Sequence, residues 1–293
     1  MKNINWSELG FGYFKTDYNV RCEYKDGKWG ELYATEDVNM NIHMASTCLH
    51  YGQEVFEGLK AFRGADGKVR LFRVEENAKR MINSGEYLKM AVPSVELFTK
   101  ACIEAVKLNA DYIPPYGSGA SLYLRPMLIG VGPQVGVKPS ADYLFAVFVT
   151  PVGPYYKDGF NCIKVIIDYD HDRAAPKGTG HVKVGGNYAA SLDSGEIAHQ
   201  KGFASVIFLD PATKQYIDEC SAANFFGIRD GKYITPDSHS VLPSITNKSL
   251  RQIAEDLGLK VEQRKVGVEE LPTFSEAGCC GTAAVISPIC LLY

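Results

Sequence analysis

The sequence predicts a two-domain protein of mixed α/β and α+β architecture. Its 293 residues exceed the length of about 100–200 residues that is common for one domain. Segments with strand and helix patterns are mixed in two blocks, and the stretch between them, 151–156, contains two prolines and a glycine. We therefore expect a small N-terminal α/β domain at 1–150, a linker at 151–156 and a large domain at 157–293.

The first block begins with hairpins and continues into two helices. Asp26-Gly27 and Asp66-Gly67 are turn dipeptides between short apolar stretches, a pattern typical of β-hairpins. Ser94 belongs to a residue type that caps helix N-termini, and apolar residues follow it at helical spacing. These apolar residues are Phe98, Ala101, Cys102, Ala105 and Val106. We expect helices at 75–88 and after Ser94, and strands at 70–72, 122–128 and 143–150.

The second block alternates strands and helices. Apolar runs predict core strands at 163–167 and 205–209, with a helix at 189–201 between them. Asp230-Gly231 predicts another hairpin, and a helix at 247–257 should end at Gly258. A strand near Val261 and a last strand at 283–286 complete the expected elements.

Composition excludes several classes of function. A net charge of −3 provides no basic surface for nucleic acid or for an anionic membrane. The longest apolar run, 143–152, is about half the length of a membrane span. The N-terminus has no apolar signal core, and eight scattered cysteines without a Cys-x-x-Cys pair indicate buried thiols rather than disulfides or a metal site. We expect a cytoplasmic protein with no metal.

The most informative segment surrounds Lys183. Four glycines flank this lysine within the stretch 178–186, so the backbone there can approach a ligand closely. Burial lowers the pKa of a lysine, and the resulting neutral amine can attack a carbonyl to form a Schiff base. A surface lysine in a glycine-rich loop is the alternative. A phosphate-binding P-loop is disfavoured because the Gly-Lys-Ser/Thr ending is absent.

Other residues offer what a phosphorylated pyridine cofactor needs. Glu219, ahead of an apolar hairpin strand, could pair with the ring nitrogen of pyridoxal phosphate, although a surface acid is equally compatible. Phosphate could be bound at 244–246, which begins the predicted helix, at Thr282 and by Arg80. The alternatives are a helix cap, a strand residue and an exposed helix arginine, respectively.

These segments together resemble the branched-chain aminotransferase family, within the fold-type IV pyridoxal-phosphate enzymes that are similar to D-amino acid aminotransferase. The likeness covers most of the chain and follows the family's order. It is carried by HYGQEVFEGLKAFR at 50–63, Arg80-Met81, SLYLRP at 121–126, GTGHVKVGGNY at 178–188, DECSAANFF at 218–226, LPSIT at 242–246 and GTA at 281–283.

The resemblance implies a role for each matching residue. Lys183 would carry pyridoxal 5'-phosphate as a Schiff base and shuttle protons, Glu219 would pair with the pyridine nitrogen, and Tyr188 would bind the phenolic oxygen. The expected phosphate ligands are Arg80, Ile245, Thr246 and Thr282. The expected substrate pocket contains Tyr51, Phe56, Tyr123 and Arg125, with the backbone of Thr282 and Ala283 near the substrate carboxylate.

The resemblance also implies the reaction and the assembly. Leucine, isoleucine or valine would give its amino group to 2-oxoglutarate, and the enzyme would be a homodimer. A D-amino acid aminotransferase or an aminodeoxychorismate lyase would share Lys183 and Glu219, but the pattern at 123–126 argues against both. A non-catalytic cofactor-binding protein would be expected to lack one of these two residues. The sequence does not rank the three substrates or separate biosynthesis from breakdown.

Two features depart from the family's pattern. Ala284 and Ser287 occupy the positions of a redox-sensitive Cys-x-x-Cys that some eukaryotic members carry, so we expect no such switch. The chain stops at Tyr293, where the family usually continues through a last helix. We therefore expect a truncated large domain.

Overall fold

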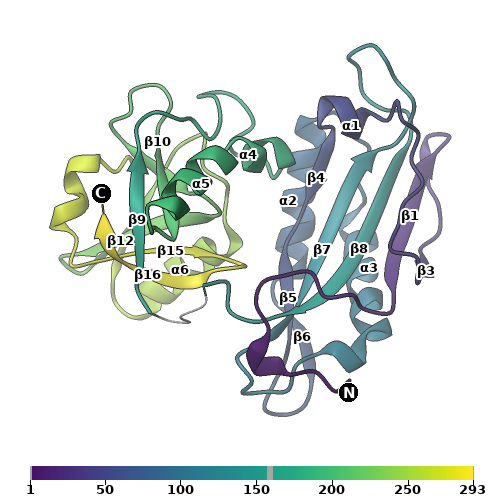
Figure 1. The fold of residues 1–293 in the computed structure, drawn as a ribbon, viewed down its shortest axis with the longest axis horizontal. Helices are drawn as coiled ribbons and strands as arrows, with labels where there is room; N and C mark the ends of the chain where they lie inside the picture. Colours follow the sequence, from purple (N-terminus) through teal and green to yellow (C-terminus); the bar gives the residue numbers. More distant parts are fainter. Residues whose placement is uncertain (1, 157–160, 293) are drawn as a thin grey trace. The chain divides into compact units, whose positions relative to one another are not determined.

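The computed structural model describes residues 2–156 and 161–292, with side chains described as far as residue 290 (Figure 1). The chain forms two compact units. The first comprises Met1–Tyr155 and Val182–Gly185, and the second comprises Tyr156–His181 and Gly186–Tyr293. The division falls inside the predicted linker, although strand pairing continues through the first two linker residues. Residue 157, the expected start of the large domain, lies outside the described residues. The short segment containing Lys183 groups with the first unit, which the sequence did not predict.

The first unit is built on one antiparallel sheet. Six strands follow the order β2-β1-β8-β7-β5-β6, β3 pairs with β1, and β4 pairs with β7. The strands are β1 (Asn19–Lys25), β2 (Lys28–Trp29), β3 (Tyr33–Thr35), β4 (Glu54–Phe56), β5 (Leu59–Arg63), β6 (Val69–Leu71), β7 (Ser121–Gly130) and β8 (Tyr143–Val152). The helices are η1 (Trp6–Glu8), α1 (Thr47–Tyr51), α2 (Val74–Tyr87), α3 (Val95–Leu108) and η2 (Ala110–Tyr112).

Two helices cover one face of this sheet, and Figure 1 shows α2 and α3 behind β7 and β8. The Ser94 side chain caps α3 by accepting the Leu97 N–H, and the five apolar residues predicted on this helix are all buried. Alternate residues of β7 and β8, such as Leu124 and Phe145, complete the core. The predicted amphipathic pattern and its cap are therefore confirmed.

The hairpin predictions are also confirmed. Tyr24 pairs with Trp29 and Lys25 with Lys28, so Asp26-Gly27 is a two-residue turn. Both turn residues have positive φ, 50° and 78°, as a type I′ turn requires. Asp66-Gly67 lies in the loop that joins β5 and β6, which pair in antiparallel register.

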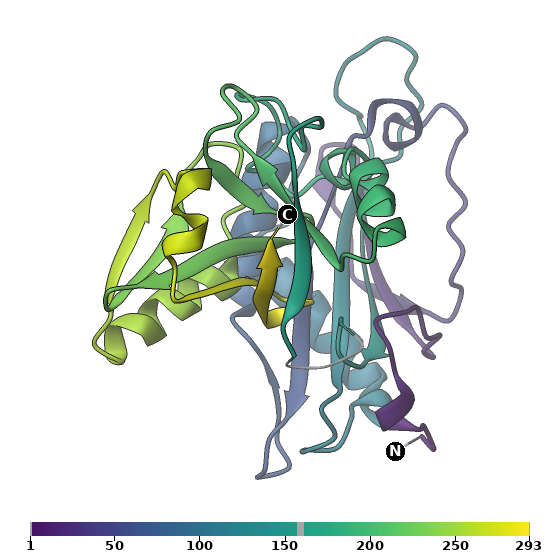
Figure 2. The ribbon, with the colours of Figure 1, turned by 60° about the vertical axis from the view of Figure 1, so that its left-hand side comes forward.

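The sheet of the second unit closes on itself. Its strands follow the order β11-β10-β9-β16-β15-β12-β13-β14, and an additional pairing joins β11 to β12. Six strands therefore form a ring, with β13 and β14 attached outside it. Figure 2 shows β9 running beside β16. The strands are β9 (Ile163–Asp168), β10 (Ser205–Leu209), β11 (Ile217–Cys220), β12 (Ala223–Arg229), β13 (Lys232–Pro236), β14 (Lys260–Arg264), β15 (Glu276–Gly281) and β16 (Val285–Leu292).

The helices of this unit are α4 (Gly185–Ala189), α5 (Leu192–Gln200), α6 (Ile245–Asp256) and η3 (Val268–Thr273). The single helix predicted at 189–201 is wrong in its first part, because α4 and α5 are separate. The strand predicted at 283–286 also begins too early, since residues 282–284 form the turn between β15 and β16. Glu219 lies within β11 and, as predicted, ahead of the apolar strand β12, with which β11 forms a hairpin.

All eight cysteines are free thiols. Five are buried as predicted, whereas Cys162 and Cys290 are exposed, which corrects the expectation that these residues act as small core hydrophobes. Among the residues that the structure describes, no helix combines the length and apolar character needed to cross a membrane.

Candidate active site

The backbone around Lys183 is held by residues of the first unit. The Lys183 N–H donates to the Ser84 hydroxyl oxygen at 3.1 Å, and its carbonyl accepts the Phe56 N–H at 3.1 Å. The neighbouring Val182 and Val184 are buried in the core of that unit. These contacts fix the point from which the Lys183 side chain extends.

The Lys183 amine lies over an aromatic ring. Its Nζ atom is 4.6 Å from the centroid of Phe56. Burial lowers the pKa of Lys183 to about 8, and the charges of Arg80 and Arg125 act in the same direction. Glu57 and Tyr123 partly oppose this shift. A large share of the amine is therefore neutral near pH 8, as a nucleophilic lysine requires.

One face of the first sheet carries polar and aromatic residues. Lys60 on β5 pairs directly with Tyr123 on β7, so the two side chains share a face. Arg125, two residues further along β7, projects to the same side. The alternate residues Leu122 and Leu124 are buried in the helix-covered core. Because side chains alternate along β7, Leu122 and Leu124 face the hydrophobic core, whereas Tyr123 and Arg125 face the side that carries the candidate site.

Arg125 contacts both aromatic residues predicted for the pocket. Its guanidinium carbon is 4.8 Å from the Phe56 ring centroid and 5.3 Å from that of Tyr123, and it donates to the Tyr123 hydroxyl at 3.1 Å. No ion pair with a carboxylate is found for Arg125 within the described ranges, and its buried Nε atom has no hydrogen-bond partner there. Burial raises the pKa of the Glu54 carboxylate and the charge of Arg125 acts on it in the opposite direction, although no ion pair joins the two among the described residues.

Three residues that the sequence analysis did not select extend this cluster. The Phe11 ring makes edge contacts with Tyr123 and Tyr155, at centroid distances of 5.1 and 5.2 Å. Lys60 is 7% exposed, its Nζ lies 5.9 Å from the Phe11 centroid, and burial lowers its pKa to about 8. Lys60 stands inside the apolar run 59–62, and this could have indicated a buried lysine near the site. The sequence around Phe11 and Tyr155 contains no comparable indication.

Arg80 is held by a buried carboxylate of the same unit. Its Nε and one terminal nitrogen donate to the two Glu57 oxygens, each at 2.8 Å. Glu57 is fully buried and also accepts the Asn77 amide at 2.8 Å. Arg80 is thus an oriented, largely buried cation on α2 and not an exposed helix arginine.

Tyr51 lies apart from the other predicted pocket residues in its described contacts. It is the last residue of α1, is 40% exposed, and its hydroxyl donates to the Val135 carbonyl. Among the described residues, Tyr51 forms no hydrogen bond with Tyr123 or Arg125 and no ring contact with Phe56 or Tyr123; its ring contacts His50. Its substrate role therefore remains a prediction.

In the second unit, Glu219 is a buried acid with several partners. One carboxylate oxygen pairs with Arg173 and accepts the Leu242 N–H at 3.3 Å, and the other accepts the Asn224 amide at 2.9 Å. Burial raises the pKa of Glu219, and the Arg173 charge is the strongest influence in the opposite direction. The carboxylate is therefore built into the strand network rather than exposed at a strand end.

The N-terminus of α6 is linked to this acid. The Ser244 hydroxyl accepts the Asn247 N–H at 3.2 Å, and helix geometry leaves the N–H groups of Ile245 and Thr246 without intrahelical acceptors. The Asn247 amide donates to Asn224 at 3.2 Å, and Asn224 in turn donates to Glu219. The N–H groups suited to phosphate and the buried carboxylate thus share one network.

The remaining predicted cofactor residues lie in turns and a short helix. Thr282 and Ala283 form part of the turn between β15 and β16, where Gly281 pairs with Val285. Tyr188 is in α4, and its carbonyl accepts the Ser191 N–H at 3.1 Å and hydroxyl at 2.8 Å. These residues belong to the second unit with Glu219, so the predicted site residues fall into two described groups.

Comparisons with known proteins identify relatives over nearly the whole chain. Residues 54–292 match the family described as amino-transferase class IV. A branched-chain-amino-acid aminotransferase of Haemophilus influenzae is 53% identical over 99% of this chain and 86% of its own length. The protein of the same name from Helicobacter pylori is 52% identical, with the same two coverages.

Solved structures show the same fold. The branched-chain amino acid aminotransferase of Escherichia coli superposes with a TM-score of 0.79 at 28% identity, over 95% of this chain and 87% of that chain. The branched-chain aminotransferase of the archaeon Thermoproteus uzoniensis, solved with norvaline, gives a TM-score of 0.76 at 26% identity, covering 93% and 87% of the respective chains.

Proposed function

The chain belongs to the amino-transferase class IV family, and we propose that it transfers the amino group of leucine, isoleucine or valine to 2-oxoglutarate, giving a branched 2-oxo acid and glutamate. The Lys183 amine, with its pKa of about 8, its contact with Phe56 and its nearby arginines, carries this proposal. Similarity to two bacterial branched-chain-amino-acid aminotransferases over nearly the full chain supports the substrate class.

We propose pyridoxal 5'-phosphate as the cofactor, because both groups of residues fit its chemistry. Its aldehyde requires an amine, its phosphate requires N–H donors and a cation, and its ring nitrogen requires a carboxylate. The residues that would hold it are Lys183, Glu219, Tyr188, Arg80, Ile245, Thr246 and Thr282. When bound, the cofactor supplies an electron sink for the bond that breaks at the substrate's α-carbon.

Lys183 is proposed to hold and move protons at its Nζ atom. The neutral amine would take a proton from the α-carbon of the amino acid, and in the reverse half-reaction it would return one to the carbon that becomes the α-carbon of glutamate. A pKa of about 8 keeps both the neutral and the charged form accessible at neutral pH, as an acid–base group requires. The Phe56 ring, whose centroid is 4.6 Å from Nζ, bounds the amine on one side.

Glu219 is proposed to provide a fixed negative charge for the ring nitrogen. A carboxylate can accept about four hydrogen bonds, and Arg173, Leu242 and Asn224 leave capacity for one further donor. The N–H groups of Ile245 and Thr246 and the positive end of α6 favour phosphate. The Asn224–Asn247 contact keeps these two functions at a fixed spacing.

The substrate must be recognised in two chemical forms, apolar and acidic. We propose that Phe56 and the Tyr123 ring form the apolar walls for a branched aliphatic side chain. Arg125, together with Tyr51, would bind the second carboxylate of glutamate or 2-oxoglutarate. Arg125 is half-buried, and within the described part of the chain it forms no ion pair and its buried Nε atom has no partner. This supports the assignment, since withdrawing a cation from water is costly unless an anion binds beside it. The backbone of Thr282 and Ala283 would receive the α-carboxylate.

A homodimer in the cytoplasm is the proposed state of the enzyme. Val135, whose carbonyl accepts the Tyr51 hydroxyl, is 85% exposed, and Val137 is 86% exposed. A second copy could cover this apolar surface. The eight free cysteines support a reducing compartment.

An amino-acid panel with 2-oxoglutarate as acceptor tests the proposed function. We expect turnover with leucine, isoleucine and valine and none with D-amino acids. Borohydride treatment of the cofactor-loaded protein should attach the cofactor to one peptide, and that peptide should contain Lys183. Activity confined to D-amino acids, or attachment at another lysine, would contradict the proposal.

A further inference from the structure

Arg173 is a buried cation that joins three separate segments of the second unit. Its side chain is 9% exposed. One terminal nitrogen pairs with Glu219 and also donates to the carbonyl oxygens of Gly180, at 3.0 Å, and Ser240. A guanidinium remains protonated in proteins, so this charge is permanent.

Each of the three segments leads to a proposed cofactor residue. Gly180 precedes Lys183 by three positions, Glu219 is itself the proposed partner of the ring nitrogen, and Ser240 lies in the segment that enters α6. A Cβ atom at Gly180 would overlap the Ser240 backbone, so only glycine allows these two segments to pack this closely. This close approach brings both carbonyls within reach of one nitrogen.

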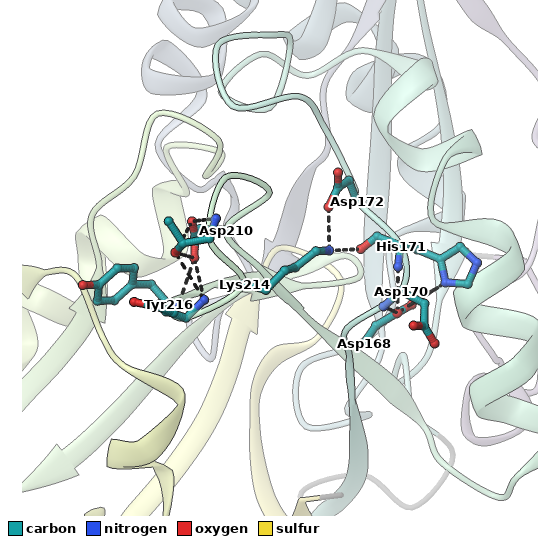
Figure 3. Close-up of polar contacts among 9 residues, drawn as sticks. Asp168, Asp170, His171, Asp172, Asp210, Lys214 and Tyr216 are labelled. Atoms are coloured by element: carbon teal, nitrogen blue, oxygen red, sulfur yellow. Dashed lines mark hydrogen bonds and ion pairs between the residues drawn. The ribbon is translucent and has the colours of Figure 1, made fainter.

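The backbone ahead of Arg173 is anchored by charged groups, as Figure 3 shows. The Asp168 carboxylate accepts the N–H groups of Asp170 and His171 at 2.8 and 3.0 Å. Lys214 donates to the His171 carbonyl at 2.7 Å and pairs with Asp172 at 2.5 Å. Arg173 therefore extends from a braced turn rather than from an unrestrained loop.

The turn that carries Lys214 is braced in the same way. The Asp210 carboxylate accepts the Thr213 N–H at 2.8 Å. It also accepts the Tyr216 N–H at 2.9 Å, as Figure 3 shows. The turn after Asp168 therefore holds the segment that carries Arg173, and Lys214 connects it to the second turn, which Asp210 caps.

The charge balance at Glu219 depends on Arg173. Glu219 is 4% exposed, and burial favours its neutral form. The opposing groups are the Arg173 cation, the Leu242 N–H and the Asn224 amide, whereas Asp218 adds a like charge. The ionisable thiols of Cys220 and Cys280 also lie within its electrostatic influence. Arg173 is the one cation among these groups.

We propose that Arg173 is a positioning residue for the transfer reaction: its guanidinium keeps Glu219 ionised and fixes it relative to the segments that lead to Lys183 and α6. This inference rests on the proposed function, because Glu219 matters only if it serves a ring nitrogen. A neutral Glu219 would donate a hydrogen bond to an uncharged ring nitrogen, whereas an ionised Glu219 accepts one from a protonated ring nitrogen and stabilises its charge. A purely structural clamp would hold the segments without affecting the ionisation of Glu219.

Three variants of the full chain separate these possibilities. Arg173→Met removes the charge and the contacts, Arg173→Gln retains an amide donor without the charge, and Arg173→Lys retains the charge with a different shape. Arg229→Met is the matched control, since Arg229 pairs with Glu270 at 3.0 Å, away from the proposed site residues. Infrared difference spectra against Glu219→Gln report the ionisation of Glu219, with and without pyridoxal phosphate.

Arg173→Gln and Arg173→Met should show a protonated Glu219 at neutral pH, and Arg173→Lys and Arg229→Met should show a carboxylate. The leucine half-reaction of the neutral variants should slow by about tenfold for each pH unit by which the pKa of Glu219 exceeds the assay pH, and should recover as the pH rises. If Arg173→Met does not fold, the Lys and Gln variants make the same comparison.

A carboxylate signal in Arg173→Gln at neutral pH, or a loss of rate that does not change with pH, would overturn the proposal. The infrared measurement requires no turnover. A native enzyme that fails to transaminate branched-chain amino acids would instead count against the proposed function.

Discussion

Arg80 and Glu57 form a two-point ion pair, in which two nitrogens donate to the two carboxylate oxygens at 2.8 Å each. Glu57 is fully buried, and its charge raises the pKa of Lys183 against the lowering effect of burial and of Arg80. The pair therefore both orients the proposed phosphate ligand and influences the nucleophile. This dual influence leads to a test in which one substitution alters two measurable quantities.

Glu57→Gln should reduce the free energy of unfolding by about 3 kcal/mol, because it leaves the buried Arg80 cation without its counter-charge. It should also lower the pKa of Lys183 below about 8. Urea unfolding measures the first effect. The pH dependence of Lys183 labelling by an amine reagent in cofactor-free protein, read by mass spectrometry, measures the second.

Glu76→Gln is the matched control on α2, the helix that carries Arg80, because Glu76 pairs at 3.3 Å with the exposed Lys79. It should change the stability by less than about 1 kcal/mol. An unchanged labelling profile in Glu57→Gln would show that Glu57 does not influence Lys183.

Lys60 makes the free energy of unfolding depend on pH between about 8 and 10.5. Burial lowers its pKa from 10.5 to about 8, so between these values the unfolded chain binds a proton that the folded chain does not. Stability from this residue therefore rises with pH across the window. Lys60→Met removes the penalty, and the variant should exceed the native chain by about 3 kcal/mol below pH 8.

That difference should shrink as the pH approaches 10.5, as measured by urea unfolding at a series of pH values. Lys79→Met, which replaces an exposed lysine, should give a curve parallel to that of the native protein. Parallel curves for Lys60→Met as well would mean that Lys60 is not desolvated.

Arg125→Met tests the proposed recognition of two substrate types. Glutamate and 2-oxoglutarate turnover should fall by about tenfold to hundredfold, the scale of a hydrogen bond to a charged group, whereas the leucine half-reaction should change much less. Single-turnover absorbance measures each half-reaction separately. Tyr123→Phe, which keeps the ring and the cation but removes the 3.1 Å hydroxyl contact, should affect glutamate less than Arg125→Met does. Equal losses in both half-reactions would refute dual recognition.

Gly58 tests the placement of the Tyr123 ring. A Cβ atom at Gly58 would overlap the Tyr123 hydroxyl oxygen, so Gly58→Ala should displace the ring and lower kcat/KM for leucine. Gly195→Ala on α5, where nothing lies within 4 Å of the added atom, should preserve activity and raise stability by about 0.5–1 kcal/mol. Native activity in Gly58→Ala would show that Tyr123 does not form a pocket wall.

Patterns within a short stretch of sequence correctly predicted the helix caps, helix faces and turns whose conformation depends on neighbouring residues alone. The cap at Ser94 and the apolar stripe of α3 follow from helical spacing, and the turn at Asp26-Gly27 follows from its need for positive φ. The predicted start of the last strand, at residue 283, was wrong because Ala283 and Ala284 are apolar like strand residues, whereas the Gly281–Val285 pairing places both in a turn. This pairing is local in sequence, but its register is not contained in the residue composition.

The site was predicted only in part, for a similar reason. Motif resemblance selected Lys183, Glu219 and Arg125, whose chemistry is carried by single residues. Arg173 was missed because its significance arises from three segments that meet only after folding. The ion pair of Arg80 with Glu57 was missed as well, since the two residues are 23 positions apart and Glu57 lies in the connection between β4 and β5, whereas Arg80 is on α2.

The segment Val182–Gly185 belongs to the first unit, although the residues before it, up to His181, and after it, from Gly186, belong to the second. A gene fragment ending at the first boundary would encode Phe56, Tyr123 and Arg125 but not the lysine that they surround. The two units therefore cannot be exchanged between relatives as contiguous modules without separating the nucleophile from its pocket. An active chimaera would need either to take residues 182–185 from the same relative as the first unit or to place its single crossover after residue 185.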